Sequence, residues 1–99
     1  MRLVMTESAW RSLDQAIYVL SVRWDDRVVD RIVTEIWEHI DIVLQYPLGG
    51  QLEEDLAELG RQHRRMVCGH FKIIYFVEGE DLYVTDIFDS RQDPGKMKG

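Results

Sequence analysis

The spacing of apolar residues changes once along this chain, and that change constrains its fold more than any other feature. Between Thr6 and Gln45 apolar residues recur at steps of three and four, the spacing of one face of an α-helix. Between Met66 and Phe88 the chain is rich in alternating β-branched and aromatic residues, which favours β-strands. The run from Tyr46 to Gly50, with one proline and two glycines, separates the two parts. Helices and strands segregated in this way predict an α+β fold.

The helical part divides into two helices joined by a short polar link. Thr6 is the expected N-cap of the first helix, which runs to about Val22. Asp25 is the expected N-cap of the second helix, which ends near Gln45, before Pro47. A link this short predicts an antiparallel hairpin whose apolar faces pack on each other or on a sheet. The tryptophans expected in the core at this spacing are Trp10 and Trp37.

The remaining segments are expected to complete one sheet. Met1–Met5 is predicted to be a short strand, and Gly69 to mark either a bulge or a tight turn that splits two later strands. Residues 53–59 form either a short helix or a loop, and the residues after Pro94 form a tail. We therefore expect one domain over residues 1–99. Its fold is α+β, with an N-terminal strand and a helical hairpin packed on a mainly antiparallel sheet.

Composition narrows the class of protein. The chain is 45% hydrophobic, enough for one modest core, and has no apolar run of bilayer length, so a cytoplasmic protein without membrane contact is expected. Cys68 is the single cysteine, and we expect no disulfide, metal or other cofactor. The net charge of −6 disfavours a protein that holds nucleic acid mainly by its phosphates. A local cationic patch is nevertheless expected, because the stretch from Arg61 to Val77 contains no acidic residue.

Two segments carry a resemblance to a known family. From His63 to Val77 arginines open a strand that ends near Ile-Ile-Tyr, and from Leu82 to Pro94 a last strand closes on Arg91. With the helical hairpin and the break that follows it, these segments resemble the RelE/ParE toxin family over nearly the whole chain. The resemblance implies a growth-inhibiting toxin of a type II toxin–antitoxin system, of the plasmid-stabilisation type. Its partners would be a cognate antitoxin, which docks on the helices and a sheet edge, and either DNA gyrase or ribosome-bound messenger RNA as target.

Cationic side chains are the candidates for contact with either target. RNA cleavage needs cations around the scissile phosphate and a group that takes the 2′-hydroxyl proton. By this resemblance a ribonuclease would use Arg64, Lys72 and Arg91, with Arg91 in the place of the family's functional arginine after the last strand. Two structural alternatives stay open. Arg91, beside Asp89 and Asp93, forms only a surface ion pair or fastens the tail, and Arg64 pairs with the acidic loop of residues 53–58.

Other positions are candidates for contact with a partner protein. Trp24 lies in the polar link between the helices, where it would anchor an antitoxin or a homodimer. Arg64 and Arg65 are consecutive on a strand and are therefore expected on opposite faces. His63 and His70 are expected at solvent-exposed turn positions. The residues expected to bind a partner are Trp24, Arg64, Arg65 and Arg91.

The charge pattern favours binding over cleavage. The loop after the second helix is acidic where cleaving members of the family are basic, and no tyrosine or histidine follows Arg91. We therefore expect a toxin that binds DNA gyrase. The alternatives are a ribosome-dependent mRNA endoribonuclease and an inactive toxin that retains only antitoxin binding. In either active form the last strands are expected to bring Arg64 and Arg91 into a common hollow.

Overall fold

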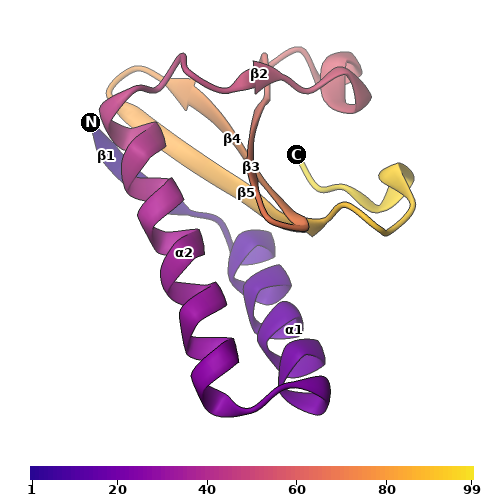
Figure 1. Cartoon of the computed structure of the whole chain (residues 1–99). Coiled ribbons are helices and arrows are strands. Elements are labelled where there is room, and N and C mark those ends of the chain that lie inside the picture. Colours follow the sequence, from indigo (N-terminus) through magenta and orange to yellow (C-terminus); the bar gives the residue numbers. More distant parts are fainter.

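A computed structural model describes all residues from Met1 to Gly99 and shows one five-stranded sheet with two long helices on one of its faces (Figure 1). The sheet order is β1-β5-β4-β3-β2, with β1 parallel to β5 and every other pair antiparallel. The expected α+β fold is confirmed. In chain order the elements are β1 (Arg2–Met5), α1 (Glu7–Arg23), α2 (Asp26–Gln45), β2 (Gln51–Leu52), the 3₁₀ helix η1 (Glu54–Leu59), β3 (Arg64–Cys68), β4 (Phe71–Glu78), β5 (Asp81–Asp89) and the 3₁₀ helix η2 (Pro94–Lys96).

Both long helices begin at the predicted caps. The Thr6 hydroxyl accepts a hydrogen bond from the Ala9 N–H, and the Asp25 carboxylate accepts one from the Val28 N–H. Trp24 ends α1 with an extended backbone, and α2 begins directly after Asp25, so the hairpin link is as short as expected. Neither helix carries an apolar stretch of the length and purity that crossing a bilayer requires.

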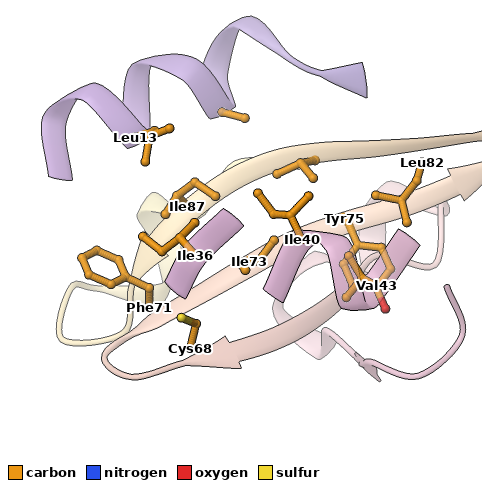
Figure 2. Close-up of a cluster of buried hydrophobic side chains, with 12 residues drawn as sticks. Leu13, Ile36, Ile40, Val43, Cys68, Phe71, Ile73, Tyr75, Leu82 and Ile87 are labelled. Atoms are coloured by element: carbon orange, nitrogen blue, oxygen red, sulfur yellow. The ribbon is translucent and has the colours of Figure 1, made fainter. Parts of the chain in front are cut away.

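The larger core lies between the helices and the sheet. Figure 2 shows Leu13 of α1 and Ile36 and Ile40 of α2 packed against apolar side chains of β3, β4 and β5. The prediction for Trp10 is wrong, because this side chain is 47% exposed. On α1 the residues that face the sheet are Ala9 and Leu13, so Trp10 is turned toward α2, where its ring lies 5.9 Å from that of Trp37. Trp37 is half-buried against the core.

The second face of the sheet is also covered. A smaller cluster joins Leu56 of η1, Ile74 and Phe88 of the sheet, and Met97. Met97 belongs to residues 93–99, which we name the closing segment. The expectation of a free tail after Pro94 is therefore wrong: the segment folds back because an apolar face of the sheet is available to bury Met97.

One irregularity in the sheet decides which side chains meet the closing segment. Ile74 of β4 pairs with Asp86 of β5, but Tyr75 pairs with Val84, so Thr85 is an extra residue in β5. Such a bulge interrupts the alternation of side chains between the two faces. As a result the consecutive residues Thr85 and Asp86 both contact the closing segment.

Candidate functional site

A cleft of about 290 Å³ lies between α1 and the chain that follows β5. One wall is α1, which contributes the apolar side chains of Ala16, Val19 and Leu20. The opposite wall is the end of β5 together with residues 91–98. We name this the α1–β5 cleft. Its walls are held together by Ser12, whose hydroxyl accepts a hydrogen bond from the Ile87 N–H at 2.8 Å.

The α1–β5 cleft gathers positive charge in an otherwise acidic protein. Of the twelve lysines and arginines in the chain, four line it, against two aspartates. One of these aspartates, Asp86, is buried, and this burial raises the pKa of its carboxyl above the usual value. The four cations are Arg11, Arg91, Lys96 and Lys98. An apolar wall with a cationic rim suits an amphipathic segment that carries acidic residues.

Arg91 is in the α1–β5 cleft, but its guanidinium is already bound. It donates to Asp89 through Nε at 3.0 Å and through a terminal nitrogen at 2.8 Å, and the backbone N–H of Arg91 bonds the same carboxylate. These hydrogen bonds hold the pKa of Asp89 below its usual value. The pair with Asp89 stiffens the turn after β5. The Arg91 side chain is 57% exposed, so its guanidinium stays open to a partner.

Arg64 and Arg65 leave β3 on opposite faces, as predicted. Arg64 faces the helix side and donates to the carbonyl of Gly50 at 2.7 Å. Arg65 faces the other side, where it donates to the Leu52 carbonyl at 2.8 Å and lies 3.6 Å from the Glu53 carboxylate. The acidic loop is thus paired with Arg65, and the structural alternative that paired it with Arg64 is wrong.

Lys72 lies on the same face as Arg65 and shares its partner. Its amine is 3.7 Å from Glu53, whose side chain is only 2% exposed. The two cations therefore flank one buried carboxylate, of which Oε1 has no hydrogen-bond partner.

The expected common hollow is not formed. The α1–β5 cleft contains Arg91 but neither Arg64 nor Lys72 among the residues that line it. Arg64 and Lys72 extend from opposite faces of the sheet, because Arg64 pairs with core-facing Tyr75 while Lys72 lies beside Glu53. The three residues proposed for RNA cleavage thus sit in three separate surroundings.

A solved structure shares this fold. A chain in the structure described as the chromosomal ParDE toxin–antitoxin (TA) system from P. aeruginosa matches with a TM-score of 0.75 at 20% sequence identity. The match covers 90% of this chain and 95% of that chain. The fold is ParE-like. The fold expected from the resemblance to RelE/ParE toxins is therefore confirmed, while no protein-family profile and no curated protein sequence matches the chain.

The two histidines of the ParE-like sheet differ from each other. His70 is exposed in the turn between β3 and β4, as predicted. His63 is 2% exposed and packs edge-on against Phe76, so the prediction of an exposed turn position is wrong. Neither ring nitrogen of His63 has a hydrogen-bond partner. Burial, and then the charge of Arg61, lower the pKa of His63, which favours a neutral ring.

Exposed apolar side chains gather near the end of α1. Trp24 is 53% exposed, in agreement with its predicted place in the link. Val22 and Tyr18 are also exposed, and Val19 extends this surface into the α1–β5 cleft. Tyr18, Val19 and Val22 lie off the helix face whose apolar residues recur at core spacing, so the sequence pattern did not mark them.

Sequence reasoning missed three polar residues, two of them in the α1–β5 cleft and one outside it. Glu53 was treated only as part of an acidic loop, although it is the shared partner of two cations. Asp86 was treated as one more residue of the last strand; its signal was a carboxylate in the interior of a strand of mostly apolar residues. Ser12 carried the weaker signal of a serine spaced four residues from Ser8 on one side of the first helix.

Proposed function

We propose that this chain is the toxin of a type II toxin–antitoxin system and that it arrests growth by binding a macromolecular target, DNA gyrase. The toxin part of the proposal is supported by the ParE-like fold, because the chain with that fold comes from a toxin–antitoxin system. The choice of binding over RNA cleavage is supported by what the cationic side chains already contact.

Each candidate cation already contacts an oxygen of this chain. Arg64 binds a backbone carbonyl, Arg65 and Lys72 flank the Glu53 carboxylate, and Arg91 binds Asp89. Cleavage requires preorganised cations that converge on one phosphate, and these side chains point to three different places. This is the single observation that carries the proposal. Binding a protein target needs no such convergence and tolerates a net charge of −6.

The α1–β5 cleft is the surface we assign to the antitoxin. Its apolar wall and four cations match a partner segment that alternates apolar and acidic residues. The exposed side chains of Val22 and Trp24 continue the apolar surface beyond the cleft. Because truncation of a central apolar contact is costly at an interface, Val19→Asp is expected to weaken antitoxin binding at least tenfold. Val67→Asp is the matched control, because Val67 is an exposed valine like Val19 but lies on β3, outside the α1–β5 cleft. Val67 is 58% exposed and Val19 is 45% exposed.

The direct test is the effect of purified protein on supercoiling of a relaxed plasmid by DNA gyrase. We expect inhibition that grows with protein concentration and that Arg91→Ala weakens only several-fold, because the contact with gyrase is spread over a surface. No inhibition at a concentration that arrests cells would refute the gyrase target. New cut sites in ribosome-bound messenger RNA, abolished by Arg91→Ala, would establish the endoribonuclease in its place.

A further inference from the structure

The backbone of Lys98 is held by two buried side chains of β5. The Thr85 hydroxyl donates to the Lys98 carbonyl at 3.0 Å, and the Asp86 carboxylate accepts from the Lys98 N–H at 2.9 Å. Thr85 and Asp86 are 1% and 3% exposed, and they act together only because the bulge turns consecutive residues to one face. A donor and an acceptor fixed in this way satisfy both polar groups of one residue's backbone, whatever its side chain.

The residues on either side of Lys98 are recognised by shape. Met97 is buried in an apolar pocket formed by Leu56, Ile74 and Phe88. The Lys98 side chain is exposed at the edge of the α1–β5 cleft, so no packed pocket fixes its identity. Together these surroundings select an apolar residue and leave the side chain of the next residue open.

The position of Gly99 favours a residue without a side chain. A Cβ placed there would overlap Cδ1 of Leu59 and lie 3.1 Å from Nε2 of His63. Leu59 is 55% exposed and can turn away, so the buried His63 ring sets the cost of a larger residue.

The closing segment leaves this surface incompletely satisfied. Both ring nitrogens of His63 are buried beside Gly99 and have no hydrogen-bond partner. Unpaired buried polar groups are costly, so an occupant that reached them would bind better than the present one. The segment is also short and is held by the two Lys98 hydrogen bonds and one apolar side chain. These features fit a segment that another peptide can displace.

We propose that the face of the sheet around Thr85, Asp86 and His63 is a recognition site for an extended segment of a partner protein, with the pattern apolar, then any residue, then glycine. Met97, Lys98 and Gly99 occupy the site in cis until such a segment replaces them. The inference does not rest on the proposed toxicity, because it uses only the contacts of the closing segment.

The test measures binding of a fluorescent peptide with the sequence of residues 92–99 to full-length variants. Met97→Asp removes the apolar anchor from the chain's own segment but leaves the site intact. We expect this variant to bind the peptide at least tenfold more tightly than the unmodified protein, in which the tethered segment competes at millimolar effective concentration. Leu48→Asp is the matched control, because it puts the same charge on an apolar side chain that is 72% exposed and lies outside the closing segment, so it should not open the site.

Two further measurements decide whether the site is the one proposed. A peptide with aspartate in place of methionine should not bind, and adding Thr85→Val to the Met97→Asp protein should weaken binding roughly tenfold, through loss of one buried hydrogen bond. A folded Met97→Asp protein that binds neither peptide, or both equally, overturns the proposal. If Met97→Asp does not fold, excess peptide added to the unmodified protein should accelerate hydrogen exchange of the Lys98 amide, and no acceleration overturns it as well.

Discussion

Replacing Tyr75 by phenylalanine removes a single oxygen atom from the centre of the protein. That oxygen accepts the N–H of Gly50 at 3.0 Å, and Tyr75 is fully buried. The contact is close, because a Cβ on Gly50 would lie only 2.5 Å from the hydroxyl. It therefore joins the loop after α2 to the central strand β4, and it also positions the Gly50 carbonyl that holds Arg64.

The expected loss of stability follows from the group left without a partner. The Gly50 N–H stays buried in the variant, and an unsatisfied buried donor costs about 1–3 kcal/mol. For a domain of this length each kcal/mol lowers the melting temperature by roughly 4–8 °C. Tyr18→Phe is the control: its side chain is 66% exposed, so a change below about 0.5 kcal/mol is expected.

Urea unfolding followed by tryptophan fluorescence measures both variants. At neutral pH Tyr75→Phe should lower the midpoint without changing the slope. Burial raises the pKa of Tyr75, so the unfolded chain loses this proton first, and the wild-type protein loses stability as pH rises above the usual tyrosine value of 10.0. The Tyr75→Phe variant lacks this hydroxyl, so the difference in unfolding free energy between the wild-type protein and the variant should become smaller above pH 10.0. A Tyr75→Phe protein as stable as Tyr18→Phe would refute the buried hydrogen bond.

Three further predictions concern other buried groups. Because burial lowers the pKa of His63, the neutral ring contributes stability above pH 6.5, and this stability is lost as pH falls through the lowered pKa. In urea unfolding between about pH 7.5 and about pH 5, His63→Phe should not show this loss of stability. Equal pH dependence of the unfolding free energy in the variant and the wild-type protein would contradict the prediction. Leu13→Ala should cost about 2–5 kcal/mol in thermal unfolding, against under about 0.5 kcal/mol for exposed Val22→Ala; equal costs would be incompatible with the packing of α1. Burial, followed by the charges of Glu35 and Glu38, raises the pKa of Cys68. The thiol of Cys68 should therefore react with a disulfide reagent far more slowly in the native protein than in the unfolded protein. Similar reaction rates in the two states would show that the Cys68 thiol is accessible in the native protein.

Local chemistry was sufficient to predict most of the fold. The caps at Thr6 and Asp25, the break after Gln45 and the turn at Gly69 depend on residues close together in sequence, and the structure has each of them where it was expected. The N-terminal strand was also predicted, but pairing it in parallel with β5 joins the two ends of the chain, and no local pattern encodes such a contact.

Long-range contacts explain what the sequence could not reveal. The bulge at Thr85 reverses the alternation in β5, so Ile87 joins the helix-facing core and Phe88 the opposite face. His63 is buried because the closing segment returns over it, which its neighbours in sequence do not indicate. The sequence shows that each arginine is charged, but the partner of each arginine depends on strand register. The register places Arg65, and not Arg64, on the face where it forms an ion pair with Glu53 of the acidic loop.

The most direct measurement of the proposed toxin function is growth of bacterial cells after induction of this chain, alone and together with the protein encoded by the adjacent open reading frame. Growth should stop within a few generations when the chain is produced alone and should be restored by the partner, which should also co-purify with it. Restoration should fail when the chain carries Val19→Asp in the α1–β5 cleft, and should persist with Val67→Asp. Normal growth with folded, abundant chain and no partner would contradict the assignment as a toxin.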